Sequence, residues 1–423
     1  MKPNPLLPKL RLLLAPVLLL CSCLTLQSQD IVNDYQQFMK AYTDKKYEDC
    51  IRYGTALVKF SGHPGIQYKV AECYCQSGQL TESLNLLGTL VKRGLPYKPG
   101  NNSGFAPLNG HKQYEKYKKA FEKNAAVVDR SSISFTVNDS LLIPEGIAYD
   151  SQHNTFYIGS LAKNKVIRCS GNGDCNDFVD AKDFGFWMVV GMKVSPDNKS
   201  LWICSASERE GSNGYAGLFQ FELPSGKLIK KFTINHKEEQ HLFNDVDFTA
   251  SGDVYFSDSK AGKVWRVAPG NDGLTEIASG YIYPNGLAID KANNILFVAD
   301  FAGVHIIHLA TGKKSKLNDQ GTTYLNGIDG LYYYQGSLIG IQDSGNQDDR
   351  VVRFYYDAQR GIVTKAVVLQ SYRKDMITPT TGTIINGQLH YIANAQLRSL
   401  QPDGSLTDPE KLVKPVILKL KLD

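Results

Sequence analysis

The chain has 423 residues, of which 21% are charged and 42% hydrophobic, a composition that is typical of a globular protein and allows two domains. Its formal net charge is +5, but Lys2, Lys9 and Arg11 belong to an N-terminal leader, and removing them leaves +5 − 3 = +2. Together with the absence of a long basic run, this weak charge argues against a nucleic-acid-binding surface.

Residues 1–28 have the pattern of a secretory leader, a basic start followed by an apolar run from Leu12 to Leu20. The run is too short for a transmembrane span. We therefore expect an exported protein that is periplasmic or extracellular. Two forms of its N-terminus are left open. The segment 20–23 resembles a bacterial lipoprotein cleavage site, with Cys23 as the lipid anchor, whereas cleavage near Ser28 would release a soluble product.

Six cysteines follow the leader, and export permits them to form disulfides. Cys169 and Cys175 bracket a short glycine-containing loop, so we expect these two to pair. For the other four, buried free thiols and disulfides are equally compatible with the sequence.

Residues 30–125 show apolar side chains at helical spacing, as in Tyr35, Phe38 and Tyr42. Two similar segments begin at Tyr47 and Leu80, 33 residues apart, each after a polar turn. This layout resembles about two tetratricopeptide repeats. Two interpretations are left open for this helical domain: it docks a protein partner in its groove, or it only packs against the rest of the chain.

From residue 131 to residue 423 the pattern changes to short strands and turns. A hairpin motif, in which two apolar runs flank a turn, recurs six times at intervals of about 40 to 55 residues, the range of a propeller blade. Its copies begin near Pro144, Gly191, Asn244, Pro284, Asp329 and Thr381. The sequence therefore predicts a mainly β fold, a six-bladed β-propeller preceded by a small α-helical domain. The final run, Val416 to Leu422, has an edge-strand pattern that could complete the first or last blade.

One position before each inner strand should face the central channel, so the six side chains there should form a ring. In chain order these positions carry Glu145, Gly191, Asn244, Asn285, Asp329 and Thr381. Four of them are oxygen donors, two carboxylates and two amides. Such a set suits a hard divalent cation, with Ca²⁺ the first choice, and the absence of His and Cys argues against zinc or copper.

These motifs resemble the gluconolactonase, regucalcin and paraoxonase superfamily of six-bladed propellers. The resemblance rests on Pro144-Glu145-Gly146, Phe243-Asn244-Asp245, Pro284-Asn285-Gly286 and the Asp329-Gly330 turn. It implies that Glu145, Asn244, Asn285 and Asp329 hold a catalytic metal, usually calcium, that polarises a lactone or ester carbonyl.

Two positions depart from the family's pattern. Gluconolactonase-like members carry an Arg two residues before the Asn of the third motif, where this chain has Leu242, which disfavours a sugar lactone. Paraoxonase-like members carry a proton-transferring His after the second-blade strand, where this chain has Ser205-Ala206-Ser207. His241 and Glu208 are the candidates for the missing general base.

The sequence thus predicts a calcium-dependent hydrolase of a small-molecule lactone or ester, with the cation in the propeller channel. The alternative is a non-catalytic propeller that binds a ligand or protein and uses the channel cation structurally.

Overall fold

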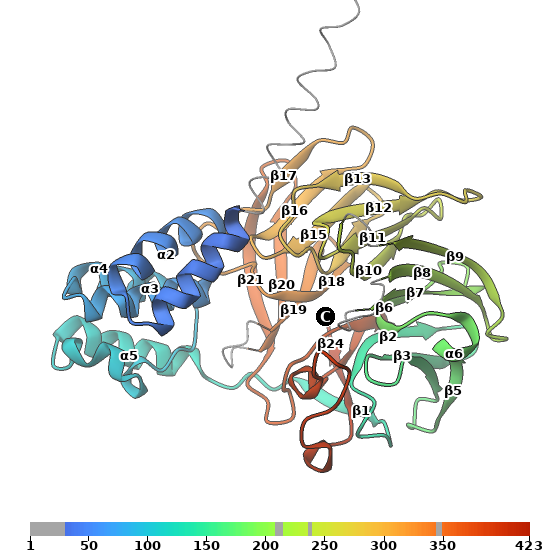
Figure 1. Cartoon of the computed structure of the whole chain (residues 1–423), viewed down its shortest axis with the longest axis horizontal. Helices are drawn as coiled ribbons and strands as arrows, with labels where there is room; N and C mark the ends of the chain where they lie inside the picture. Colours follow the sequence, from blue (N-terminus) through green and yellow to red (C-terminus); the bar gives the residue numbers. More distant parts are fainter. Residues whose placement is uncertain (1–29, 208–214, 236–238, 344–348) are drawn as a thin grey trace, which may run out of the picture.

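The structure is a computed structural model that describes residues 30–207, 215–235, 239–343 and 349–423. The long helices precede residue 125 and gather at one side of the strands, which follow it with only short helices between them (Figure 1). None of the described helices is both long and apolar enough to cross a membrane. The expected leader and its candidate anchor Cys23 lie outside the described residues.

The residues before the propeller form helices, as their apolar spacing predicted. A first helix covers residues 30–43. It is followed by α2 (Tyr47–Ser61), α3 (Pro64–Gln76), α4 (Leu80–Lys92), the short 3-10 helices η1 (Pro99–Asn101) and η2 (Ser103–Leu108), and α5 (Lys112–Asn124). Gly62 ends α2 at φ 63°, and His63 begins α3 by accepting a hydrogen bond from the Gly65 N–H at 3.2 Å. The resemblance to tetratricopeptide repeats stays a prediction.

The strands form six four-stranded antiparallel sheets around a channel, as predicted for a six-bladed propeller (Figure 1). Blades one to three consist of β2 (Pro144–Asp150), β3 (Thr155–Ser160), β4 (Lys165–Cys169) and β5 (Cys175–Asp180); β6 (Met188–Val194), β7 (Ser200–Ala206), β8 (Tyr215–Glu222) and β9 (Leu228–Asn235); and β10 (Phe243–Phe248), β11 (Val254–Asp258), β12 (Lys263–Val267) and β13 (Thr275–Ser279). A short helix, α6 (Ala181–Phe184), links the first two blades.

The remaining blades follow the same order, except that the last one combines both ends of the strand region. Blades four to six consist of β14 (Leu287–Asp290), β15 (Ile295–Asp300), β16 (Gly303–His308) and β17 (Lys314–Lys316); β18 (Ile328–Tyr334), β19 (Ser337–Gln342), β20 (Arg350–Asp357) and β21 (Ile362–Ser371); and β22 (Gly382–Ile385), β23 (Gln388–Ile392), β24 (Val416–Lys421) and β1 (Ser131–Thr136).

The sixth blade closes the ring. Strand β24 pairs with β23 on one side and with β1 on the other, so the C-terminal strand completes the last blade, one of the two predicted possibilities. Because β1 comes from the beginning of the propeller and leads along the chain into the first blade, its backbone hydrogen bonds to β24 join the two ends of the propeller within the sixth blade.

Apolar clusters between neighbouring blades hold the propeller together. Blades four and five, for example, bury Phe297 and Phe354 against each other's strands, and blades six and one bury Ile147 and Ile417. All four side chains are at most 2% exposed. A side chain of this size contributes roughly 1.5–3 kcal/mol when fully buried, so the interblade layers stabilise the propeller.

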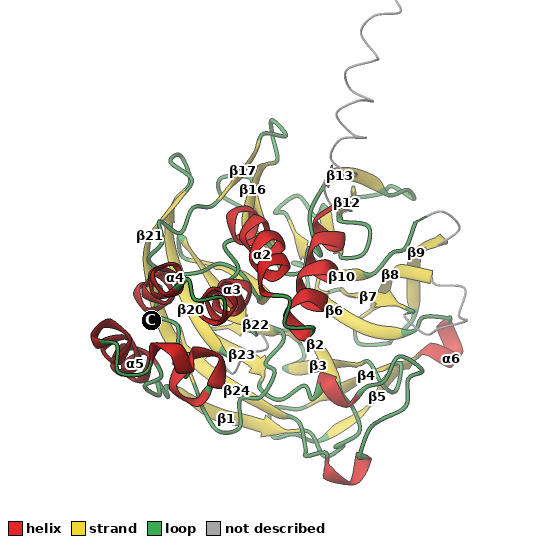
Figure 2. Ribbon diagram, turned by 60° about the vertical axis from the view of Figure 1, so that its left-hand side comes forward, coloured by secondary structure: helices red, strands yellow, loops and turns green. Residues whose placement is uncertain are grey.

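The helical part is docked on loops of blades four and five, and Figure 2 shows α2 and α3 in front of the strands. Arg93, only 6% exposed, donates from Nε to the carbonyl of Thr323 at 2.9 Å and from Nη2 to Asp319 at 3.2 Å. His63 stacks on Phe301 with ring centroids 5.1 Å apart. These contacts fix the helices beside the channel.

The structure contains two disulfides within its described residues. Cys169–Cys175 joins the ends of the hairpin between β4 and β5, as predicted. Cys50–Cys73 links α2 to α3, and Cys75 and Cys204 are buried free thiols, so the four cysteines left undecided by the sequence divide into one disulfide and two thiols.

Candidate metal centre and substrate cavity

The candidate site is built from an irregularity that four of the six inner strands share. Each of β2, β6, β10 and β18 loses register with its neighbour over two residues where the strand starts, for example between Pro144 and Ile147 and between Ile328 and Leu331. A β-bulge of this kind turns a side chain out of the sheet's alternation. The bulged pairs include Glu145-Gly146, Asn244-Asp245 and Asp329-Gly330, so the bulges direct three of the four predicted ligands into the channel, whereas Asn285 lies just before the regular strand β14.

Glycines in these pairs allow the inner strands to approach one another closely. A Cβ on Gly146 would lie 2.2 Å from the carbonyl oxygen of Val190, and a Cβ on Gly286 would lie 2.3 Å from that of Asp329. The same holds for Gly191, whose Cβ would lie 2.2 Å from the carbonyl oxygen of Asn244. Any larger residue would push neighbouring blades apart at the level of the candidate ligands.

Two members of the predicted ring are each one residue off. Gly146 packs against the carbonyl of Val190 as Gly191 packs against the carbonyl of Asn244. Gly191 is thus the equivalent of Gly146, and the residue before it, Val190, is the equivalent of Glu145 and lines the channel cavity. In the sixth blade the equivalent residue is Thr380 and not Thr381. In blades one, four and six the ring residue follows a left-handed residue and a proline, and these left-handed residues are Ile143 (φ 46°), Tyr283 (φ 53°) and Thr378 (φ 56°). The sequence motif did not reveal how the bulge shifts the register.

All four predicted ligands line one cavity of 570 Å³ at the mouth of the channel: Glu145, Asn244, Asn285 and Asp329. Glu145 and Asn244 are 6% exposed. The Asn244 side chain donates from Nδ2 to Ser259 Oγ at 2.9 Å, and Ser259 Oγ donates to the carbonyl of Pro284 at 2.6 Å. This chain of hydrogen bonds leaves the amide oxygen of Asn244 as the atom available to the cavity.

Three of the oxygens at this site are buried without any hydrogen-bond partner among the described residues: Glu145 Oε2, Asn285 Oδ1 and Asp329 Oδ1. Buried acceptors in native proteins are almost always satisfied, so an unsatisfied group of three in one cavity indicates a missing partner. All three atoms are acceptors, which means that the partner must be a donor or a cation.

The raised pKa values of the acidic side chains at the site also indicate a missing cation. Burial, with the nearby charge of Asp343, raises the pKa of Asp329 to about 7. Burial also raises the pKa of Glu145 well above its usual range, with Asp329 as the next contribution, and raises that of Asp245 to about 6. Without a cation these carboxyl groups resist sharing full negative charge.

The donor set fits a calcium ion. Two carboxylates and two amide oxygens form a hard, irregular oxygen cage, which suits calcium better than magnesium. Within the described ranges no three His, Cys, Asp or Glu side chains gather as a metal-binding group. A cation site here would therefore need its two asparagines as well as its two carboxylates.

Of the two candidate general bases, only His241 belongs to the described residues. His241 is 5% exposed, and its Nδ1 lies 2.6 Å from Asp258 Oδ2, which also accepts a hydrogen bond from Trp265 Nε1 at 3.1 Å. It is not among the residues that line the cavity, although its neighbour Leu242 is. Glu208 lies outside the described residues.

The outer wall of the cavity contains side chains that motif analysis did not identify. The long connection between β23 and β24 contributes Leu397, Leu400 and Pro402, and the first blades contribute Leu161 and Met188. With Leu242 and Tyr283 they make the mouth largely apolar, apart from Lys260 and Gln401. The unusual length of the β23–β24 connection, more than 20 residues, was the available signal.

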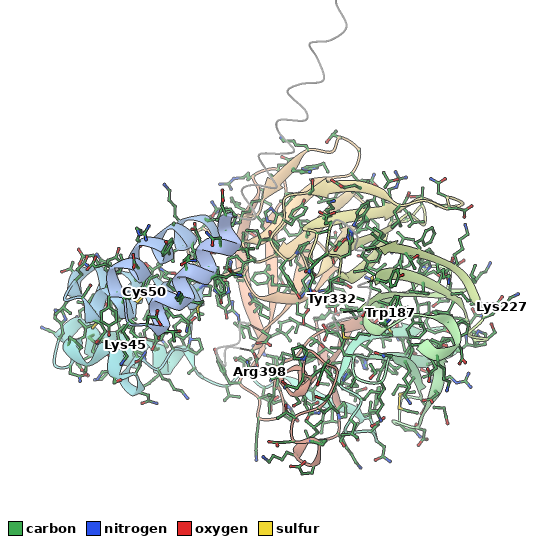
Figure 3. The ribbon with its side chains drawn as sticks, viewed as in Figure 1. Lys45, Cys50, Trp187, Lys227, Tyr332 and Arg398 are labelled. Atoms are coloured by element: carbon green, nitrogen blue, oxygen red, sulfur yellow. A yellow bond between two sulfur atoms is a disulfide. The ribbon has the colours of Figure 1, made fainter. Side chains whose placement is uncertain are left out.

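Figure 3 places Tyr332 near the centre of the propeller. This residue of β18 reaches the next blade, because its hydroxyl accepts a hydrogen bond from the Gly382 N–H at 2.5 Å. Burial raises the pKa of Tyr332, and the nearby acids Asp245, Asp329 and Glu145 act in the same direction. The hydroxyl therefore stays neutral and ties blades five and six together beside the cage.

Residues 143–332 match the family model described as the SMP-30/Gluconolactonase/LRE-like region. The matched stretch contains all four predicted ligands. No curated protein matches the sequence.

Solved structures are similar to this chain at low sequence identity. The major allergen Mala s 1 of Malassezia sympodialis is 14% identical and has a TM-score of 0.52; the match covers 66% of this chain and 93% of the allergen. XC5397 from Xanthomonas campestris, described as a gluconolactonase, is 16% identical with a TM-score of 0.47, over 71% of this chain and 93% of its own. At such identities these similarities concern the fold alone.

Proposed function

We propose that the protein is a hydrolase of lactones or esters that depends on calcium in the propeller channel. The match of residues 143–332 to the SMP-30/Gluconolactonase/LRE-like region supports this proposal. The observation that carries the proposal is the group of three unsatisfied buried oxygens on Glu145, Asn285 and Asp329. A bound calcium ion would supply Lewis-acid polarisation of the substrate carbonyl.

The residues of the chain have separate tasks in this proposal. Glu145, Asn244, Asn285 and Asp329 hold the ion. Ser259 keeps the Asn244 oxygen directed at the cavity, and Tyr332 and the bulge glycines keep the blades at the required spacing. Positions held this rigidly before the substrate arrives lower the reorganisation that catalysis requires.

The wall of the cavity favours a substrate with an apolar substituent. Leu242, Leu397, Leu400 and Met188 offer no hydrogen bonds to the hydroxyl groups of a sugar, but they can cover an alkyl or aryl group. Burying such a group contributes roughly 25 cal/mol per Å² of apolar surface. We therefore expect lactones with alkyl chains and aryl esters to be better substrates than sugar lactones.

The test is hydrolysis of a matched panel, δ-decanolactone, phenyl acetate and gluconolactone, before and after chelation. We expect turnover of the first two, loss of activity on chelation, recovery with calcium, and loss of at least about 100-fold in kcat/KM in Asn285→Ala. Leu242→Arg should shift the preference towards gluconolactone. An activity that survives chelation would contradict the proposal.

A second function has an observation in its favour. His241 does not line the cavity, and within the described residues no other His does, so a general base beside the ion is unassigned. A propeller that binds a ligand at the same ion without hydrolysing it would show calcium binding and no turnover across the panel.

A further inference from the structure

A groove separates the helical part from the sixth blade, beside the channel mouth. Its first part, 840 Å³, lies between residues of the N-terminal part such as Tyr42 and Lys98 and propeller loops that include Arg398. Its second part, 1070 Å³, continues between Val127 and Val413. Both parts share Tyr372, Arg373, Lys374 and Ile377, and we call them together the interdomain groove.

The interdomain groove lies next to the candidate catalytic cavity and is distinct from it. The two are separated by the connection between β23 and β24, where Leu397 lines the cavity and Arg398 lines the groove. Figure 3 shows Arg398 between the helical part and the propeller. None of the four candidate metal ligands lines the groove.

Positive charge concentrates in this groove. Its lining contains six basic and three acidic side chains, a net charge of 6 − 3 = +3: Lys69, Lys98, Arg373, Lys374, Arg398 and Lys414 against Asp129, Asp349 and Asp375. The chain without its leader has a net charge of only +2. The groove is therefore positive against a nearly neutral remainder, as expected of a surface that meets an acidic ligand.

Several of these cations are not used by the fold. Arg373 is engaged, at 2.5 Å from Asp375 and 2.8 Å from Asp129. Lys98 and Lys374, in contrast, are exposed and form no ion pair with any described residue. Lys414, at the far end of the groove, is likewise exposed and forms no ion pair with any described residue.

Apolar side chains are exposed in the same place. Val127, Ile377 and Val413 are 62%, 58% and 55% exposed, and all three line the second part of the groove. They are three of the eight large hydrophobic side chains that are exposed in the described part of the chain. Aliphatic side chains that gather in a groove rimmed by charge are typical of protein-binding surfaces.

We propose that the interdomain groove binds an extended segment of a partner protein that carries both acidic and apolar side chains. The carboxylates of such a segment would pair with Lys98, Lys374 and Lys414, and its apolar side chains would cover Val127, Ile377 and Val413. An acidic polysaccharide would match the charge but leave these aliphatic side chains exposed to water, which is why the peptide is favoured. The proposal does not depend on hydrolase activity.

The experiment measures fluorescence anisotropy of a labelled peptide of alternating Glu and Leu, titrated with the exported chain. The probe should bind, and binding should weaken as salt rises, because about 10 Å of Debye length at 0.1 M shrinks to about 3 Å at 1 M. Lys98→Glu combined with Lys374→Glu should weaken binding by about 10-fold, since two favourable pairs become repulsive.

The matched control is Lys227→Glu combined with Lys231→Glu, the same charge change on the second blade, and Figure 3 shows Lys227 at the opposite edge of the molecule. It should bind the probe as the unaltered protein does. Ile377→Ser with Val413→Ser should also weaken binding. The proposal is overturned if the probe does not bind, if both charge reversals behave alike, or if a Glu–Ser peptide or polyglucuronate binds as well as the Glu–Leu probe.

Discussion

At the scale of single residues, the candidate cage depends on neighbours that carry no charge. Ser259 orients Asn244, and the carbonyl of Glu145 accepts hydrogen bonds from the hydroxyls of Thr380, at 3.2 Å, and Thr381. Gly286 lets the fourth and fifth blades meet. These residues hold the backbone and side chains of the candidate cage in place.

The first prediction concerns Gly286. Its Cβ in Gly286→Ala would lie 2.3 Å from the Asp329 carbonyl oxygen and 2.7 Å from the Leu331 nitrogen, both backbone atoms that cannot move independently. We expect a loss of about 1–3 kcal/mol in the free energy of unfolding, because blades four and five must separate, and weaker calcium binding. Urea denaturation measures the first effect.

The matched control is Gly273→Ala, because a Cβ on Gly273 would meet no atom within 4 Å and its φ is not left-handed. It should leave stability within about 0.5 kcal/mol of the unaltered protein. If the two variants were equally stable, the close packing of the inner strands at the cage would be refuted.

How far the sequence predicts these residues depends on whether they repeat. Glu145, Asn244, Asn285 and Asp329 were identifiable because they stand at one point of a repeated motif, and the structure brings them to one cavity. In the second blade the sequence pattern placed Gly191 in the ring, one residue after the correct residue, Val190. The reason is a β-bulge between Val189 and Met192, which shifts the strand register and leaves no trace in a periodic pattern. The contact between His241 and Asp258 was not predictable either, because the two residues are 17 positions apart and only the pairing of the strands brings them together.

At the scale of elements, the sixth blade carries the closure of the ring. Leu418 of β24 is fully buried, stands opposite Tyr391 of β23 and Ile133 of β1, and belongs to the cluster between blades five and six. The blade is therefore both a sheet of its own and the joint between the two ends of the propeller.

The second prediction follows from that position. Leu418→Ala should destabilise the protein by about 2–5 kcal/mol, because it removes buried apolar contacts and leaves a cavity. Lys419→Ala, on the opposite face of the same strand, should change stability by less than about 1 kcal/mol. The measurement is the midpoint of urea unfolding for both variants, and a Leu418 effect as small as that of Lys419 would contradict the closure.

Elements were predictable where their pattern is local. The hairpin turns and the alternation of apolar residues gave the strands of each blade, and the helical spacing of Tyr35, Phe38 and Tyr42 gave the first helix. The Cys50–Cys73 bridge was not predictable, because it depends on how α2 packs against α3. The same is true of Leu397 and Leu400, which reach the cavity from a long connection without a repeat.

At the scale of the whole molecule, the junction between helices and propeller depends on residues far apart in the chain. Arg93 donates to the Gly62 and Thr323 carbonyls, and Asn326 donates to the carbonyls of Ser61 and Phe301 at 3.0 and 2.9 Å. Contacts over some 230 to 265 residues cannot be derived from local periodicity. The sequence therefore left the role of the helical domain open.

The third prediction is a pH dependence at this junction. Burial, with the charge of Arg93, lowers the pKa of His63 to about 4 from 6.5. The folded state thus binds fewer protons than the unfolded state, so this contribution to stability is complete above pH 6.5 and is lost as the pH falls towards 4. The melting temperature should decrease between pH 7 and pH 5.

His63→Asn should reduce that decrease, because Asn can accept the Gly65 N–H but has no titrating group. Thermal unfolding at several pH values compares the two proteins. If their melting temperatures fell in parallel, His63 would not be the group responsible.

The central claim is that one calcium ion binds between Glu145, Asn244, Asn285 and Asp329. Isothermal titration of calcium into chelator-treated protein tests it most directly, without any substrate. We predict one ion per chain, and an affinity reduced by roughly 100-fold or more in Glu145→Gln combined with Asp329→Asn, which remove the two charges of the cage. Asp272→Asn, at an exposed ion pair with Lys230, should bind as the unaltered protein does. A folded protein that binds no calcium, or a double variant that binds it equally well, would contradict the claim.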